Sequence, residues 1–221
     1  AALRLVSPVL ILDGTIDVDG TDATQHSSGG SGGSAWMTVG VLRGSWGKVT
    51  CTGGNREGNG AAGGGGGRIA LYCTTSEYGS VAHHGWALPA LEAYGGHGHK
   101  GAGNAPTVWQ GGAGTVYVNC GSVTNALYVD NRDRVTSALR TTLLVDSGIT
   151  AYEFDTVKLM GHVVLGFAPT DTGSATVSVS IHASESAQDV VTAETQFIQI
   201  VVATLENAWV KVLRPRPGYV Q

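Results

Sequence analysis

The sequence predicts an all-β protein built as a parallel β-helix (β-solenoid), with glycine-rich turns and long inserted loops. Three observations predict it. Apolar residues alternate with other residues over short stretches, these stretches recur behind pairs of small residues, and long apolar stripes with helical spacing are missing. Of the 34 glycines, 29 lie in residues 1–121, between the alternating stretches rather than in a separate linker. The glycines therefore belong to the repeat.

The first recurring stretch reads GGSAWMTV from Gly32, GGRIALYC from Gly66 and AGTVYVNC from Ala113. One parity of the alternation is apolar in all three copies, which is typical of half-buried strands. We expect this parity to point inward, and it comprises Ala35, Met37, Val39, Ile69, Leu71, Cys73, Val116, Val118 and Cys120. The other parity, which includes Trp36, Tyr72 and Tyr117, is mixed and is expected to face solvent or a covering loop.

A second recurring stretch lies between copies of the first: TIDVDG, KVTCTGG and ALEAYGG. It places Ile16, Val49 and Leu91 in one inward column, and Val18, Cys51 and Ala93 in the next. Each copy ends in a glycine, and unequal spacing indicates an insertion near residues 78–89 or 96–110. We expect the glycines to turn corners and to permit close stacking of coils. An antiparallel sandwich with glycine-rich hairpins is the alternative, although these loops exceed usual hairpin lengths.

The chain divides by composition into residues 1–125, the glycine-rich coils, and residues 126–221, where glycine thins and the strands lengthen. We interpret the second part as further coils or a capping β region within one continuous domain. The tail RPRPGYVQ carries Pro215 and Pro217, which cannot join a central strand, so we expect an extended surface segment there.

The stretches GGSGGSAWMTV, GGGGGRIALYC, GGAGTVYV and ALYVDN resemble the glycine-rich β-helix repeats of very large extracellular and cell-surface proteins of algae, other protists and some bacteria. The resemblance covers residues 10–131 closely and the rest loosely. It implies a right-handed parallel β-helix and a structural or adhesive role outside the cell. It brings no catalytic motif with it.

Charge and hydropathy exclude several classes of partner. A formal net charge of -4, with no run of Lys or Arg, gives no footprint for nucleic acid. No apolar run reaches the roughly 18 residues that a membrane-spanning helix needs. The start without Met suits a processed product or a segment of something longer.

The three cysteines fall in inward columns. Cys73 and Cys120 share one column on consecutive coils, and stacked strands about 4.8 Å apart are within reach of a disulfide. We predict a Cys73–Cys120 bridge, with two buried free thiols as the alternative. Cys51, between Val18 and Ala93, is expected to stay unpaired.

Two clusters could bind a metal. Asp17, Asp19 and Asp22 form an oxygen-rich turn with some character of a calcium loop, although it lacks the later Glu of an EF-hand. The alternative is a solvated turn, and no other cofactor is expected. Four histidines, His83, His84, His97 and His99, could meet around zinc or copper, or could simply be exposed loop residues.

Trp86, Tyr94 and Trp109 form a candidate contact surface for sugar or protein, unless they cover the solenoid as a flap. Arg68 and Glu92 stand on outward faces, but nothing in the sequence brings them together as a lyase or hydrolase would require. We therefore expect a non-enzymatic extracellular structural protein, a stiff building block of a filament, appendage or surface coat. It would associate with itself or with neighbouring solenoid units, and glycans are further candidate partners. The alternative is a carbohydrate-binding or polysaccharide-cleaving β-helix module.

Overall fold

The computed structural model describes residues 1–24, 27–56, 62–79, 86–98, 109–132, 142–144, 151–160, 163–167, 175–181, 190–193, 198–205 and 209–212. Within these ranges the chain has strands and no helix. The strands are β1 (Ala2–Ile11), β2 (Thr15–Asp17), β3 (Ser34–Gly44), β4 (Lys48–Thr50), β5 (Arg68–Tyr78), β6 (Ala90–Glu92), β7 (Thr115–Cys120), β8 (Val123–Asp130), β9 (Thr142–Leu144), β10 (Ala151–Phe154), β11 (Thr156–Met160), β12 (Val164–Phe167), β13 (Ala175–Ile181), β14 (Val190–Ala193), β15 (Ile198–Leu205) and β16 (Trp209–Val212).

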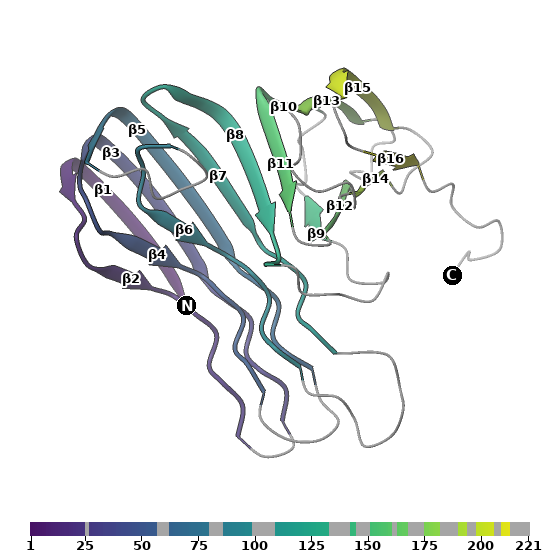
Figure 1. Cartoon of the computed structure of the whole chain (residues 1–221), viewed down its shortest axis with the longest axis horizontal. Helices are drawn as coiled ribbons and strands as arrows, with labels where there is room; N and C mark the ends of the chain where they lie inside the picture. The colour runs from purple at the N-terminus through teal and green to yellow at the C-terminus, as the bar shows by residue number, and fades with distance from the viewer. Residues whose placement is uncertain are drawn as a thin grey trace.

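The first part of the chain is a parallel β-solenoid of three coils, as the sequence predicts. Each coil contributes a longer strand, β1, β3 or β5, to one sheet and a short strand, β2, β4 or β6, to a second sheet. β7 follows the third coil as the fourth long strand, so that the first sheet has the order β1-β3-β5-β7. Figure 1 shows the two sets of strands stacked along the same direction. The parallel pairing excludes the antiparallel sandwich for this part of the molecule.

The strand register confirms the columns expected from the sequence. In the long-strand sheet Met37 pairs with Leu71, and Leu71 with Val118. In the short-strand sheet Ile16 pairs with Val49, and Val49 with Leu91. The inward positions are buried, with exposed fractions of 0% for Met37, Val49, Leu71 and Val118, 1% for Ile69 and 5% for Val116, whereas Cys73 is half-buried. The core therefore lies between the two sheets.

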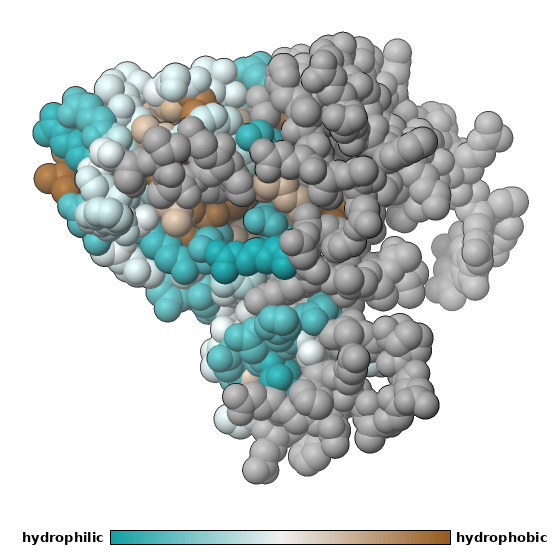
Figure 2. Space-filling model, viewed as in Figure 1, coloured by the Kyte–Doolittle hydropathy of each residue, from teal (hydrophilic) through white to brown (hydrophobic). Residues whose placement is uncertain are grey.

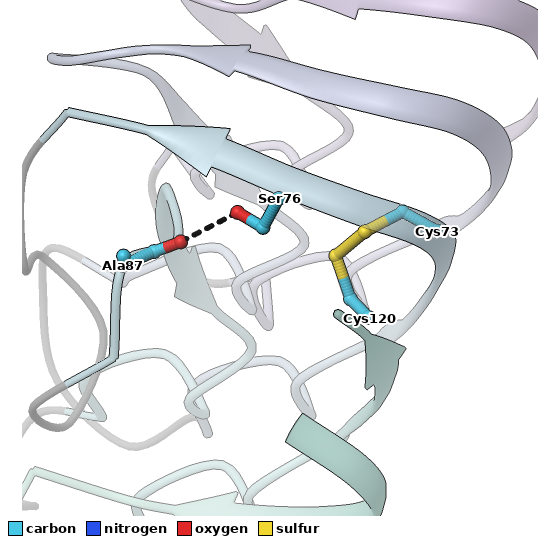
Figure 3. Close-up of a disulfide and its surroundings, with 4 residues drawn as sticks. All are labelled: Cys73, Ser76, Ala87 and Cys120. Carbon is cyan, nitrogen blue, oxygen red and sulfur yellow. Dashed lines mark hydrogen bonds between the residues drawn. A yellow bond between two sulfur atoms is a disulfide. The ribbon is translucent and has the colours of Figure 1, made fainter. Parts of the chain in front are cut away.

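The predicted bridge between Cys73 and Cys120 is confirmed. The two residues are register partners on β5 and β7, their Cα atoms are 4.3 Å apart, and their sulfur atoms are bonded (Figure 3). Beside the bridge the Ser76 hydroxyl donates a hydrogen bond of 2.8 Å to the Ala87 carbonyl, which fastens the connection after β5 to that strand. Cys51 is the buried free thiol, as expected.

Two strands depart from the sequence pattern. The repeat alignment omits β1, because Pro8 interrupts its alternation, yet β1 pairs with β3 as the first long strand. The stretch ALYVDN was expected to begin a further coil or cap, and it forms part of β8, which turns back antiparallel to β7. Gly121, with φ of +62°, makes that reversal possible. The long-strand sheet then continues through the parallel pair of β8 and β11.

Beyond the short strands, the chain leaves the sheets and returns as paired extended segments (Figure 1). The outgoing segments are residues 20–24, 53–56 and 95–98, and the returning segments are residues 27–33, 62–67 and 109–114. We call this stack the glycine bundle. Hydrogen bonds alternate between the two kinds of segment: the Gly54 N–H donates to the Gly30 carbonyl, the Gly64 N–H to that of Gly54, and the Gly96 N–H to that of Gly64.

The directions in which the glycines of the bundle face repeat every three residues. A methyl group on Gly64 or Gly67 would lie 1.9 Å from a carbonyl oxygen of the first coil, and one on Gly63 or Gly66 would lie 2.0 Å from a carbonyl oxygen of the third. Gly65 faces neither coil, with its nearest neighbour 4.0 Å away. A three-residue period with bonds only to other segments is typical of extended polyproline II-type helices.

The expected close stacking of coils is confirmed for the glycines of the bundle. Among the described glycines only Gly44 and Gly121 have a positive φ, and neither lies in the bundle. The bundle needs glycine because backbones approach too closely for a side chain.

The later strands form two further parallel sheets, in the orders β10-β13-β15 and β16-β14-β12-β9. The Pro-containing tail lies outside the described residues.

Candidate functional site

The candidate site is the end of the solenoid formed by β1, β2 and the turn that carries Trp46, which we call the N-terminal face. In the described part of the chain, β1 pairs only with β3, and β2 only with β4. One edge of each first strand thus carries N–H and C=O groups that no described strand pairs. Among the described strands, this face is the end of both sheets.

In the part of the chain that the structure describes, no strand layer covers the core columns at this face. Leu5 and Leu10 are half-buried, whereas their register partners in the next coil, Met37 and Leu42, are both 0% exposed. Ile16 is likewise half-buried beside the fully buried Val49. In each pair, the residue of the second coil has a coil on both sides, whereas the residue of the first coil has a described coil on one side only. One more layer of strands would therefore complete the core.

Large exposed apolar side chains gather at the same end. Val6, Val9 and Ile11 on β1 are 67%, 42% and 66% exposed, and Trp46 is 83% exposed. Trp46 lies close to the end of β1, because its N–H donates to the Asp13 carboxylate at 3.4 Å. Figure 2 shows a small hydrophobic patch at the left end of the molecule, bordered by hydrophilic atoms, where Figure 1 places β1. Apolar surface gathered in this way commonly marks an interaction site.

The edge also carries features that limit random strand pairing. Arg4 adds a charge to β1, and Pro8 removes one N–H donor from its middle. Such residues on an edge strand discourage indiscriminate pairing.

The predicted calcium ligands instead join coils together. The Asp19 carboxylate accepts a hydrogen bond of 2.5 Å from the Thr52 N–H, and that of Asp22 accepts one of 2.6 Å from the Asn55 N–H. Asp17 accepts a bond from the N–H of Asp19. Within the described ranges, no three His, Cys, Asp or Glu side chains gather closely enough to hold a metal ion. The acidic turn is a structural connection between the first two coils.

The same connection continues in the next coil. The Asn55 side-chain oxygen accepts a hydrogen bond of 2.9 Å from the His97 N–H. The Asn131 side-chain oxygen accepts one of 3.0 Å from the Gly95 N–H. These amides were not singled out in the sequence, although Asn55 follows Asp22 by one coil. Of the four candidate metal-binding histidines, His97 is exposed, and His83, His84 and His99 lie outside the described residues.

The three predicted aromatic contacts have different neighbours. Trp86 packs edge-on against Tyr128, with ring centroids 4.7 Å apart, whereas the Tyr94 ring lies 4.3 Å from the guanidinium carbon of Arg132. Trp109 is 49% exposed. A cavity beside Tyr94 has a volume of about 20 Å³, which is enough for a water molecule rather than a sugar ring.

Arg68 and Glu92, the charged residues expected on outward faces, lie in different sheets. Arg68 starts β5 in register with Ser34 and Thr115, both uncharged. Glu92 on β6 forms ion pairs with Lys48, at 2.8 Å, and with Arg132. Glu92 thereby ties the second coil to the segment after β8, which is a structural arrangement.

A row of aromatic residues crosses the outer surface of the long-strand sheet. The sequence placed these residues in the outward parity but did not predict that they contact one another. Trp36 stacks on Tyr72 with ring centroids 5.1 Å apart and an interplanar angle of 28°, and Tyr72 contacts Tyr117 at 5.4 Å. Because the rings of Trp36 and Tyr72 cover each other's faces, the row stabilises neighbouring coils rather than forming a flat sugar platform.

No family model, curated protein or solved structure matches this chain. In the part of the chain that the structure describes, no helix is long and apolar enough to cross a membrane.

Proposed function

We propose that this chain is a non-enzymatic structural protein of the extracellular space or cell surface. In this proposal it is a stiff β-solenoid unit that docks through its N-terminal face onto a neighbouring solenoid in a filament, appendage or surface coat. The observation that carries the proposal is the change in burial along the core columns, from half-buried Leu5 to fully buried Met37. A layer of strands placed on β1 and β2 would bury apolar surface and satisfy edge hydrogen-bonding groups at once.

Two further observations support this role. The disulfide between Cys73 and Cys120 suits an oxidising compartment such as the extracellular space. Three coils joined by strand pairing, by the glycine bundle and by a covalent bridge form a unit that resists bending. A building block of an extended assembly has to be stiff along one axis and to have an end that can dock, and this solenoid unit meets both requirements.

The proposal is tested by imaging and sedimentation of the oxidised chain over a range of concentrations. We expect elongated assemblies, and we expect Ile11→Lys to raise the concentration for half-assembly at least tenfold, because it places a charge in the apolar face. The control is Thr74→Lys, another exposed strand position, which lies on β5 away from this face. A monodisperse monomer at all concentrations, or equal effects of the two lysines, would contradict the proposal.

Glycan binding is the competing function. If the protein is monomeric and its thermal unfolding shifts with a polysaccharide, the structural proposal is overturned in favour of a carbohydrate-binding module.

A further inference from the structure

Two tyrosines on the outer surface of the long-strand sheet contact each other across neighbouring strands. In the register of β5 and β7, Ala70 pairs with Tyr117 and Tyr72 pairs with Asn119, so the two tyrosines are diagonal neighbours on one face. Their ring centroids are 5.4 Å apart and the ring planes are tilted by 46°. Both residues are half-buried, so a reagent in solution can reach them.

Other tyrosines of the described chain have different surroundings. Tyr78 is buried, and its hydroxyl accepts a hydrogen bond from the Gly47 N–H and donates one to the Leu12 carbonyl. Tyr128 is buried against Trp86. Close contact between two phenols and access to solvent coincide at the outer pair.

Sulfur-containing side chains in the same coils are protected from an oxidant. The oxidation of cysteine and methionine follows their exposure, and Cys51 and Met37 are both 0% exposed. Cys73 and Cys120 are already joined in the disulfide. An oxidant that reaches the outer surface therefore meets the aromatic row rather than these sulfur atoms.

We infer that Tyr72 and Tyr117 form a modification site, at which a haem peroxidase with hydrogen peroxide joins the two rings as dityrosine. The bond links β5 to β7 on the outer surface, whereas the disulfide between Cys73 and Cys120 joins the same two strands at inward positions. A carbon–carbon bond is not cleaved by thiols, so it keeps the two strands joined when the disulfide is reduced. This inference does not depend on the assembly proposed above.

Coupling of the two rings is a two-electron oxidation. Each phenol gives up one electron and its hydroxyl proton and becomes a phenoxyl radical. The radicals form a carbon–carbon bond between ring carbons ortho to oxygen, and the hydrogen on each of these carbons moves through solvent to a phenolic oxygen, which restores both aromatic rings. Hydrogen peroxide accepts the two electrons and two protons and becomes two molecules of water.

The surroundings of the two hydroxyls keep them protonated before oxidation. Burial raises the pKa of the Tyr72 phenol and that of the Tyr117 phenol. The Tyr117 hydroxyl also donates a hydrogen bond of 2.9 Å to Asn125 Oδ1. Each phenol therefore loses its proton together with its electron.

The test is oxidation of the full-length, disulfide-bonded chain by a haem peroxidase with hydrogen peroxide. Equal amounts of unlabelled and ¹⁵N-labelled protein are mixed first, and the disulfide is reduced and alkylated before peptide mapping, because it joins the same two peptides. We expect a crosslinked pair that fragmentation places at Tyr72 and Tyr117, lighter than its two peptides by two hydrogen atoms and derived from one isotopic form. The absence of this pair, or a main product of mixed isotopic form, would overturn the inference.

Phenylalanine variants test the site itself. Tyr72→Phe and Tyr117→Phe keep the rings but remove the hydroxyls, and each should lower the dityrosine fluorescence at least tenfold. Tyr94→Phe is the matched control and should retain the wild-type fluorescence, because the Tyr94 ring lies against Arg132. Equal losses for Tyr72→Phe and Tyr94→Phe would overturn the inference.

Dependence on the fold is tested by oxidising the chain in urea. Unfolding separates the two strands, so we expect the yield of the Tyr72–Tyr117 pair to fall at least fivefold. An undiminished yield from the unfolded chain would show that the fold does not create the site.

A final measurement tests whether the new bond takes over from the disulfide. A reducing agent should lower the melting temperature of the untreated chain, because it removes a link that constrains the unfolded state. After peroxidase treatment this drop should be at least halved, whereas treated Tyr72→Phe should show the full drop. An equal drop in treated and untreated wild-type chains would overturn this part of the inference.

Discussion

The sheets and the glycine bundle stack the same three coils by different physical means. In the sheets the repeat is two residues, and alternate side chains such as Met37, Leu71 and Val118 bury apolar surface between the strands. In the bundle the repeat is three residues, and glycines such as Gly64 bring backbone against backbone. The sheets are stabilised by apolar side chains that fill the core, whereas the bundle is stabilised by close backbone contacts that only residues without a side chain permit.

This difference predicts opposite responses to substitution. A side chain shortened in the sheet leaves a cavity, whereas a side chain lengthened in the bundle creates a clash. The glycines of the bundle are also expected to differ in how much stability an alanine substitution costs. Gly65 faces neither neighbouring coil, and Ser31 occupies the corresponding place in the first coil, so a side chain is already accepted there.

The largest effect is expected from Leu71→Ala in the sheet. Leu71 is 0% exposed and lies between Met37 and Val118, so its truncation leaves a cavity on both sides. We expect the free energy of unfolding to fall by about 2–5 kcal/mol, measured by urea denaturation. Thr74→Ala, at an exposed site on the same strand, serves as the control and is expected to change little. If the two variants lost the same free energy of unfolding, burial of the Leu71 column would not be what stabilises the sheet.

The next effect concerns the covalent link, which joins the third and fourth long strands in the sheet, β5 and β7. Replacing both Cys73 and Cys120 by alanine removes a bridge across 47 residues of sequence. We expect a loss of about 2–4 kcal/mol in the free energy of unfolding. Hydrogen exchange should show faster opening of β7 than of β1. A reducing agent should reproduce the loss in the wild-type chain and have no further effect on the variant.

A smaller and more specific effect is expected in the bundle. Gly66→Ala places a methyl group 2.0 Å from the Ala93 carbonyl oxygen, and the backbones must separate to accept it. We expect a loss of about 2 kcal/mol. Gly65→Ala, one residue away, should be neutral or should stabilise the chain by about 0.5 kcal/mol through the unfolded state. If both alanines destabilise the protein equally, the three-residue period is wrong.

The sequence was enough to predict the sheets because apolar residues mark the inward parity directly. Met37, Leu71 and Val118 align by residue type, and the same alignment predicted the pairing of Cys73 with Cys120. β1 was missed because no glycine pair precedes it and Pro8 interrupts its pattern. Without β1, the uncovered N-terminal face could not be predicted either.

The bundle was harder to predict because glycine carries no side chain to show which way it faces. The period is present as paired glycines three residues apart, at 29–30 and 32–33 and again at 63–64 and 66–67. Its meaning depends on which backbone lies opposite, and that depends on the sheet register of distant coils. The hydrogen bond of Asp22 could not be predicted for a similar reason, since its partner lies 33 residues away.

The smallest effect separates a structural aspartate from a calcium ligand at the junction of the two regions. Asp22→Ala removes the oxygen that accepts the Asn55 N–H at 2.6 Å, and we expect a loss of about 1 kcal/mol in the free energy of unfolding. Asp22→Asn keeps an acceptor oxygen while it removes the charge, so it should retain most of that stability. Calcium or a chelator should leave the melting temperature of all three proteins unchanged. If Asp22→Asn is as harmful as Asp22→Ala and calcium stabilises only the wild-type chain, the carboxylate binds a cation and the proposed hydrogen-bond role is wrong.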